Sequence, residues 1–111
     1  MIYFVELWRA KPSWEALSTD ERTAYMGQVG SAIQGLIEQG VKILTWSKND
    51  EKTDRKIAYD YMAIWTFPNQ ELADGFQKLV EGAGWYNYFE QVNFMGAEDS
   101  VENTIGQLIQ I

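Results

Sequence analysis

Runs of predominantly apolar residues along four segments of the chain predict β-strands. These segments are also rich in β-branched and aromatic residues, which favour extended backbone. They cover residues 2–9, 41–49, 57–67 and 84–96. The almost wholly polar residues 50–56, between the second and third segments, predict a solvated hairpin loop.

Apolar residues recur at three- and four-residue spacing in two further segments, which predicts two amphipathic helices. Ser18 and Glu21 form a capping box at the start of the first helix, and Gly40 ends it. Asn69 caps the second helix, and residues 82–84 terminate it. The expected buried faces contain Tyr25, Val29, Ile33, Leu36 and Ile37 in the first helix, and Leu72, Ala73, Phe76, Leu79 and Val80 in the second.

The predicted elements follow the order β-α-β-β-α-β, which is the ferredoxin-like arrangement. The expected fold is α+β, a single domain over residues 1–111 with a four-stranded antiparallel sheet in the order 4-1-3-2 and two helices on one face. Residues 98–111 form a C-terminal tail with apolar residues at helical spacing, namely Val101, Ile105, Leu108 and Ile109. This tail is expected to contain a short helix.

Both faces of the sheet are expected to be apolar. On the third strand, Ala63 and Trp65 lie on one side, and Met62 and Ile64 lie on the other. The helices cover only one of these faces, and a large exposed apolar surface marks an interaction site. We therefore predict a homodimer in which two copies pack sheet to sheet, each through its uncovered face.

Composition limits the chemistry that the chain can perform. It has 111 residues, of which 46% are hydrophobic and 14% aromatic, enough for one well-formed core. It contains neither Cys nor His, which excludes disulfides, thiolate metal sites, Ser-His nucleophiles and imidazole-bound heme or zinc. No loop has the ligand spacing of a calcium site, so no metal or other cofactor is expected.

The charge balance limits the partners. Nine Lys and Arg against sixteen Asp and Glu give a net charge of −7, which repels nucleic-acid phosphates and anionic membranes. No signal-like segment and no apolar run of membrane length appear. A soluble, cytoplasmic protein without nucleic-acid or membrane partners is therefore expected.

Three acidic residues fall within predicted strands: Glu6, Asp60 and Glu90. An unpaired buried carboxylate is costly, so each of them requires a partner, water or a cavity. With the strand order 4-1-3-2 the three acids could converge, and a raised pKa would make one of them a general acid or base. Alternatively, cationic side chains such as Arg9, or tyrosine hydroxyls, pair with each acid separately.

The strands also carry many aromatic side chains, which admit two interpretations. They could line a pocket in which indole N–H and phenol O–H groups orient a ligand. They could instead fill the core and the dimer interface, where aromatic side chains are common. The set comprises Trp8, Trp46, Trp65, Trp85, Tyr59, Tyr61, Tyr86 and Tyr88, beside Gln91 and Asn93.

Five local motifs accompany this order of elements: Glu6-Leu7-Trp8, Asp60-Tyr61, Trp65-Thr66-Phe67-Pro68, Gly84-Trp85-Tyr86 and Tyr88-Phe89-Glu90-Gln91-Val92-Asn93. Together they resemble the dimeric α+β barrel superfamily over nearly the whole chain, and within it an uncharacterised bacterial family. The resemblance implies the fold and the dimer, and it assigns no reaction. The wider superfamily includes monooxygenases, heme-degrading enzymes, mutarotases and isomerases, several of which depend on a histidine that this chain lacks.

Two functions fit these observations. The first is a monooxygenase- or isomerase-like enzyme that needs no heme or metal and binds an apolar or aromatic ligand between the sheet and its helices. Its candidate catalytic residues are Glu90 and Asp60, as general bases, and Tyr61, as a hydrogen-bond donor. Its candidate ligand-binding residues are Glu6, Trp8, Trp65, Trp85, Tyr88, Gln91 and Asn93. The alternative is a non-catalytic dimeric barrel that serves as a ligand-binding or interaction module.

Overall fold

Four antiparallel strands form a single sheet in the order β2-β3-β1-β4. In the computed structural model, which describes all 111 residues, the strands are β1 (Ile2–Ala10), β2 (Lys42–Lys48), β3 (Tyr61–Phe67) and β4 (Phe89–Ala97). The helices are α1 (Pro12–Glu15), α2 (Thr19–Glu38), α3 (Gln70–Gly82) and α4 (Val101–Ile109), with a 3-10 helix, η1 (Trp85–Asn87). The predicted ferredoxin-like order of elements and the predicted sheet order are confirmed.

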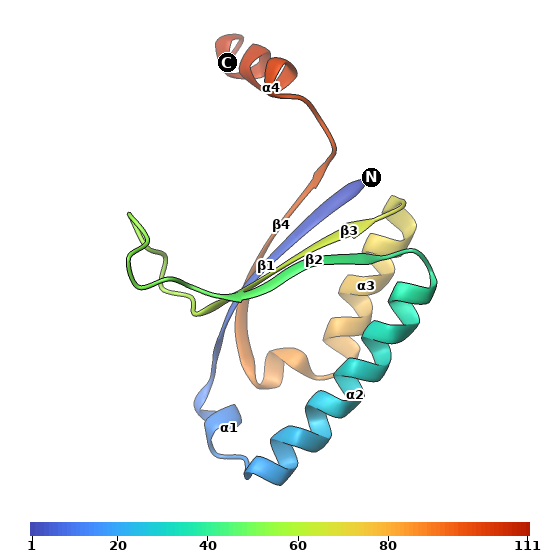
Figure 1. Ribbon diagram of the computed structural model, residues 1–111, viewed down its shortest axis with the longest axis vertical. Helices are drawn as coiled ribbons and strands as arrows, with labels where there is room; N and C mark the ends of the chain where they lie inside the picture. The colour runs from blue at the N-terminus through green and yellow to red at the C-terminus, as the bar shows by residue number, and fades with distance from the viewer.

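Helices α2 and α3 lie against one face of the sheet, the inner face, and leave the opposite, outer face uncovered (Figure 1). The core lies on the inner face and is formed chiefly by Phe4, Trp8, Ala63, Trp65, Phe67, Ala73 and Phe76. The alternate residues of the strands make up the outer face, which carries Tyr3, Val5, Leu7, Met62, Ile64, Val92 and Phe94. The prediction that both faces are apolar is therefore confirmed.

Local hydrogen bonds begin α2 and α3 where the sequence predicts. The Ser18 hydroxyl accepts from the Glu21 amide at 3.1 Å, and the Glu21 carboxylate accepts from the Ser18 amide at 3.0 Å. The Asn69 side chain accepts from the Leu72 amide at 2.9 Å. Gly40 follows α2 with a φ of 94°, a left-handed conformation that favours glycine. These caps fix where each helix meets its neighbouring strand.

Helix α2 packs on the sheet more loosely than its sequence pattern predicts. Among its twenty residues only Leu36 is buried, and Ile37, which the pattern places in the core, is 44% exposed. In α3, Leu79 is also 44% exposed, whereas Ala73 and Phe76 are buried. The loose packing of α2 leaves room for a pocket beneath it.

The third strand is shorter than predicted, because residues 57–60 lie outside β3, which begins at Tyr61. In residues 57–60, side chains donate hydrogen bonds to backbone carbonyl groups, as a neighbouring strand would do within a sheet. The Asn49 side chain donates to two of these carbonyl oxygens, at 3.3 and 2.9 Å, and the Arg9 guanidinium donates to a third, at 2.8 Å. Backbone that is held in this way extends the hairpin loop and shortens the strand.

The fourth strand also begins later than predicted, at Phe89 instead of Gly84. Gly84 has a φ of 74°, and residues 85–87 turn into η1. A glycine in the left-handed region ends α3 and redirects the chain before the strand starts. Trp85 is therefore a core side chain, 6% exposed, that does not belong to the sheet.

The C-terminal tail contains the predicted short helix. Helix α4 lies beyond the ends of the strands, away from α2 and α3 (Figure 1). Its N-cap is Ser100, whose hydroxyl accepts from the Asn103 amide at 3.0 Å. The helix thus has a well-defined start but no covering layer within its own chain.

Candidate functional site

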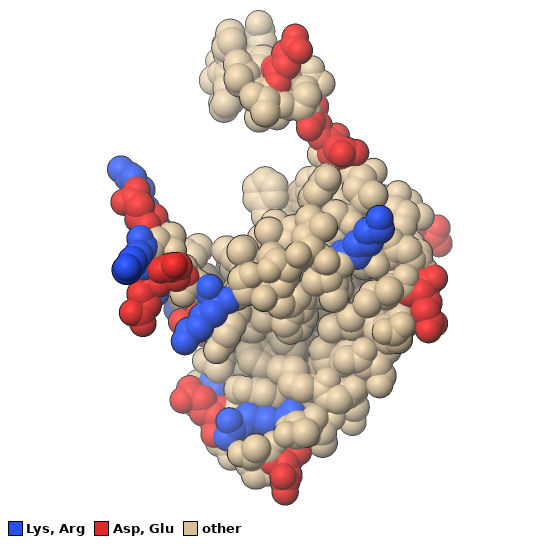
Figure 2. All heavy atoms as spheres, viewed as in Figure 1, with Lys and Arg blue, Asp and Glu red and all other residues tan.

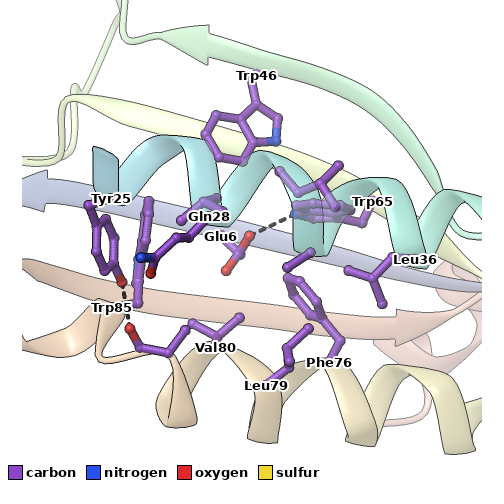
Figure 3. A pocket seen from close by; sticks show the side chains of 14 residues that line it. Glu6, Tyr25, Gln28, Leu36, Trp46, Trp65, Phe76, Leu79, Val80 and Trp85 are labelled. Atoms are coloured by element: carbon purple, nitrogen blue, oxygen red, sulfur yellow. Dashed lines mark hydrogen bonds between the residues drawn. The ribbon is translucent and has the colours of Figure 1, made fainter. Parts of the chain in front are cut away.

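An open pocket lies between the inner face of the sheet and helices α2 and α3 (Figure 3). It has a volume of about 120 Å³, and the molecular surface is hollowed between β2 and α2 (Figure 2). Of its fourteen lining residues twelve are hydrophobic, and the other two are Glu6 and Gln28. An apolar pocket with few polar groups is typical of a site for a small organic ligand.

Aromatic rings from the sheet, from η1 and from both helices form the walls. Trp65 of β3 packs on Phe76 of α3 with ring centroids 4.8 Å apart, and Trp46 of β2 lies edge-on to Trp65 at 6.2 Å. At the other end of the pocket, Trp85 of η1 stacks on Tyr25 of α2 at 6.5 Å. Because such rings are large and rigid, they keep α2 apart from the strands and the pocket open.

Glu6 lies in the middle of β1, one of the two central strands, and is only 5% exposed. Its Oε1 accepts from Nε1 of Trp65, and its Oε2 accepts from Nε2 of Gln91, both at 2.7 Å. The strand register explains this geometry. Glu6 is opposite Ala63 on β3 and Asn93 on β4, so Trp65 and Gln91 are its diagonal neighbours on the same face.

Burial raises the pKa of Glu6 above its ordinary value of 4.5, because removal from water penalises the charged form. The hydrogen bonds from Gln91 and Trp65 act in the opposite direction and only partly offset the burial. No Lys or Arg forms an ion pair with this carboxyl group. The neutral and ionised forms are therefore closer in free energy at neutral pH than those of an exposed glutamate, as acid-base chemistry requires.

Gln91 is itself held in one orientation. Its Oε1 accepts from Nε1 of Trp85 at 2.8 Å, and its Nε2 donates to Glu6 at 2.7 Å and to Oδ1 of Asn93 at 2.8 Å. Both amide hydrogens and the amide oxygen are thus used, and a flipped amide would lose all three bonds. No buried side-chain nitrogen or oxygen lacks a partner. The network fixes the Glu6 carboxyl group at the wall of the pocket.

Tyr25 connects the two helices at one end of the pocket. Its hydroxyl donates to the carbonyl oxygen of Ala83 at 2.9 Å, which ties α2 to the residue that follows α3 (Figure 3). Burial, with a further contribution from Tyr88, raises the pKa of Tyr25, so its hydroxyl stays neutral and remains a donor. Since Tyr25 and Ala83 both line the pocket, this bond closes one end of it.

The structure does not bring the three strand acids together. Glu6 faces the pocket, whereas Glu90 lies on the other side of the sheet, where Nε of Arg9 donates to its carboxylate at 2.6 Å. Asp60 is exposed just before β3, in the region of Arg9. Separate pairing, the second of the two alternatives, therefore describes Glu90, and the acids do not converge.

None of the three residues predicted as catalytic lines the pocket. Glu90 and Asp60 lie on the side of the sheet away from it, and Tyr61 is 41% exposed and stacks on Trp8 with centroids 5.9 Å apart. The alternation of side chains placed Glu90 correctly on the face of Val92. Because both faces are apolar, that alternation did not reveal which face the helices cover.

The predicted ligand-binding residues divide into two groups. Those that line the pocket are Glu6, Trp65 and Trp85. Gln91 donates a hydrogen bond to Glu6 and another to Asn93, so these two residues orient the carboxyl group without lining the pocket themselves. Trp8 packs against Trp85 at 5.8 Å, and Tyr88 packs against Tyr25 at 5.0 Å, so each supports a wall residue without reaching the pocket.

Sequence reasoning missed Tyr25 and Gln28 as pocket residues. Tyr25 was assigned to the buried face of its helix only as a core residue. Gln28 follows it by three positions, the spacing that brings two side chains to the same face of a helix. A polar residue at that position, next to Val29 in the apolar stripe, was the available signal.

No group of three or more acidic side chains is close enough to hold a metal ion. None of the helices combines the length and the hydropathy that a bilayer-spanning segment requires. Among the polar groups of the lining, the Gln28 amide and the Trp46 indole N–H form no hydrogen bond within the chain. The N–H groups of Trp65 and Trp85 and the hydroxyl of Tyr25 already donate within it.

Known families and structures place the fold. The family model described as "Family of unknown function (DUF6616)" matches residues 1–111, and no curated protein matches the sequence. A candidate chlorite dismutase, TA0507, has a TM-score of 0.71 at 14% identity, over 96% of this chain and 48% of its own, so the chain spans about half of that protein. At3g17210 from Arabidopsis thaliana has a TM-score of 0.65 at 12% identity, over 91% of this chain and 98% of its own. Identities this low show the fold alone.

Proposed function

The chain belongs to the family of unknown function DUF6616, and we propose that it binds a small apolar or aromatic molecule in the pocket beneath α2 and acts on it with Glu6 as a general acid-base group. One observation carries this proposal. A single buried carboxyl group, without a cationic partner, faces an otherwise apolar pocket. Such a group costs free energy that a purely structural core would avoid, and titratable groups of this kind cluster at functional sites.

The pocket limits the size of the ligand. Its volume of about 120 Å³ is comparable to that of a closed apolar cavity of about 150 Å³ that holds benzene, and the pocket is also open to solvent. One ring therefore fits between Trp65 and Trp85, whose flat faces favour stacking. Because Trp46 and Gln28 at the rim are exposed, a substituent on the ring can extend into solvent.

The chemistry of Glu6 favours a ligand that carries oxygen. As a carboxylate, Glu6 can take a proton from a carbon next to a carbonyl group, and as a neutral acid it can return that proton to a neighbouring atom. The sum of the two steps is an isomerisation, which consumes neither oxidant nor reductant. The donors Trp65 and Gln91 stabilise the carboxylate and burial stabilises the acid, so the site supports both steps.

Ligand binding without catalysis is the second candidate function. Both oxygens of Glu6 already accept a hydrogen bond, from Trp65 and from Gln91. A carboxyl group fixed in this way also serves as a recognition point for a ligand hydroxyl. The two functions differ in whether a proton moves between Glu6 and the ligand.

Binding can be followed by the intrinsic fluorescence of the chain, since three of its five tryptophans line the pocket: Trp46, Trp65 and Trp85. Toluene and phenol serve as single-ring probes without and with a hydroxyl. We expect phenol to bind about tenfold more tightly, because a hydrogen bond to a buried carboxyl group contributes about 1.5 kcal/mol. Equal affinities for the two probes, or no binding of either, would contradict the role of Glu6.

Two variants test the location of the bound probe. Val29→Phe places a larger side chain in the pocket wall, whereas Met26→Phe makes a similar change on α2 outside the lining. We expect the first to abolish binding and the second to leave it intact. Loss of binding in both would show that α2, and not the pocket, had been disrupted.

Proton transfer separates the two candidate functions. In D₂O, an enzyme of the proposed class would exchange the α-hydrogens of cyclohexanone for deuterium, and Glu6→Gln would abolish that exchange because an amide does not accept the proton. Nuclear magnetic resonance measures the exchange directly. Binding of the ketone without exchange above the buffer rate would identify a non-catalytic binding module.

We further propose that the protein forms a homodimer through its outer face. Two side chains of this surface on the edge strand β4, Val92 and Phe94, are 42% and 74% exposed in the single chain. Apolar strand positions of this kind are normally covered by a second layer. Light scattering at micromolar concentration tests the dimer, and a mass of one chain, 12.8 kDa, would contradict it.

A further inference from the structure

The C-terminal helix α4 has an apolar face that nothing in its own chain covers. The side chains of that face, Val101, Ile105, Leu108 and Ile109, are between 49% and 77% exposed. The helix has nine residues, and an isolated helix of that length is marginal in water. Only one of its residues, Glu102, is charged, and Figure 2 accordingly shows the helix as almost wholly uncharged. A surface of this kind requires a partner surface.

The junction before α4 holds the helix away from its own sheet. The Glu98 amide donates to the carbonyl oxygen of Met1 at 2.9 Å, so residue 98 still follows the edge of the sheet. Oδ1 of Asp99 then accepts from the Ser100 amide at 2.7 Å and from the Asn103 side chain at 3.0 Å. With three residues between β4 and α4, this hydrogen-bonded turn points the helix beyond the strands (Figure 1).

A matching surface exists on the same chain. Next to the start of α4, the outer face forms a groove whose sheet side is apolar and whose acidic residues come from the junction. The sheet side consists of Tyr3, Val5, Phe94, Gly96 and Ala97, and the acidic residues are Glu98 and Asp99. The facing residues of the strands are uncharged along most of their length, as is the apolar face of α4. Since the junction directs each helix away from its own sheet, the two surfaces meet most simply between two copies related by a two-fold axis.

Interface area also favours this arrangement. The strands have seven to nine residues and span about 26 Å on average, and four strands span about 19 Å, so the outer face has a flat footprint of about 500 Å². A standard protein interface buries about 800 Å² on each partner. Helix α4, about 14 Å long and about 10 Å wide, adds about 140 Å² and brings the sum to about 640 Å². The sheet alone is small for a stable dimer, and the helix supplies about half of the difference.

We propose that α4 is an exchanged arm: in the dimer, the apolar face of each α4 packs on the outer face of the other chain's sheet. The occupant of both surfaces is thus a second copy of this chain. The inference rests on the homodimer proposed above and adds a specific, reciprocal contact to it. It also predicts that two chains separate only when both arms are released.

Cysteine cross-linking tests this contact, because the chain has no cysteine of its own. Val5→Cys and Val92→Cys place a thiol on the outer face, and Ile105→Cys places one on the apolar face of α4. Differently tagged chains, one with a sheet thiol and one with the helix thiol, are co-expressed and mildly oxidised. We expect a disulfide-linked dimer that contains one chain of each kind.

The matched control is Gln107→Cys, on the opposite side of the same helix. We expect at least about fivefold less mixed dimer from it, since its thiol faces solvent. Three results would overturn the arm exchange: cross-linking of Ile105→Cys only to itself, a disulfide within one chain that carries both thiols, or no cross-link. If light scattering shows a dimer and any of these three results is obtained, the sheet-to-sheet dimer is supported without the arm exchange. Probe binding in the pocket is measured independently of the dimer and of the arm exchange.

Discussion

The indole N–H of Trp65 donates to the carboxyl group of Glu6 at 2.7 Å, across two adjacent strands and within the core. The two residues are diagonal neighbours on the inner face, since Trp65 is opposite Phe4 and Glu6 is opposite Ala63. The bond orients the one acid that faces the pocket and stabilises its charged form against burial. The behaviour of Glu6 is therefore the most direct test of the site.

Replacement of Glu6 by Gln changes both the hydrogen bonding and the pH dependence of stability. The new amide still accepts from Trp65, but its NH₂ group meets the NH₂ group of Gln91, which already uses both hydrogens. At pH values where Glu6 of the wild type is neutral, we expect Glu6→Gln to lower the free energy of unfolding by about 1–2 kcal/mol, because a donor is left without an acceptor.

The sign of the pH effect follows from the raised pKa of Glu6. The folded state holds this proton more tightly than the unfolded state, so the stabilisation is complete below 4.5 and is lost as the pH rises through the folded pKa. The stability difference between the wild type and Glu6→Gln should therefore shrink with rising pH. Urea unfolding from pH 4 to pH 9 measures it, with Glu15→Gln on the surface as the control. A difference that stays constant or grows with pH would contradict the raised pKa.

Removal of the Gln91 side chain should perturb Glu6 further. Gln91→Leu deletes the larger of the two hydrogen bonds that lower the pKa of Glu6, and it leaves the Trp85 N–H without its acceptor. We expect the pKa of Glu6 to rise and the free energy of unfolding to fall by about 2–3 kcal/mol. Carboxyl carbon chemical shifts report the pKa, and chemical denaturation reports the stability.

Asn93→Ala is the matched control for Gln91→Leu. Asn93 lies on the same strand and face, is exposed, and forms a hydrogen bond with Gln91 but none with Glu6, which is opposite it on β1. Its removal should leave the pKa of Glu6 nearly unchanged. If the two variants shift this pKa equally, then the network and not the direct hydrogen bond controls the carboxyl group.

The Tyr25 hydroxyl should control exchange of ligand at one end of the pocket. Tyr25→Phe removes its hydrogen bond to the Ala83 carbonyl and loosens the contact between α2 and the end of α3. We expect about 1 kcal/mol lower stability and faster dissociation of phenol, measured by stopped-flow fluorescence. Tyr88→Phe, at a neighbouring ring whose hydroxyl forms no hydrogen bond within the chain, should change neither quantity. Equal effects of the two substitutions would exclude a specific role for the Tyr25–Ala83 bond.

The local parts of the fold were predictable because their causes lie close together in the sequence. The capping box of Ser18 and Glu21 marks the start of a helix within four residues, and the strands are marked by their own β-branched and aromatic residues. The late starts of β3 and β4 were not predictable in this way. The start of β3 depends on the distant Asn49 and Arg9 side chains, which hold the loop before it. The start of β4 depends on the left-handed conformation of Gly84, which a glycine permits but does not require.

The site was only partly predictable, because it depends on strand register. The sequence identifies Glu6 and Glu90 as equally anomalous, each a carboxylate among apolar strand residues. Register separates them: Arg9 is directly opposite Glu90, while the cross-strand neighbours of Glu6 are Ala63 and Asn93. A charged partner is thus available to one acid and not to the other, and no local pattern contains that information.

This contrast between the two acids yields a final prediction. Glu90→Gln removes the ion pair between Glu90 and Arg9. The side chain of Glu90 is 48% exposed and that of Arg9 is 41% exposed. Exposed ion pairs contribute little to stability and are screened by salt, so we expect a small change that disappears at high ionic strength. Since Glu90 lies across the sheet from the pocket, the affinity for phenol should equal that of the wild type. Fluorescence titration with phenol compares the affinities of Glu90→Gln and Glu6→Gln. A loss of affinity in the Glu90 variant would show that Glu90 contributes to the ligand site.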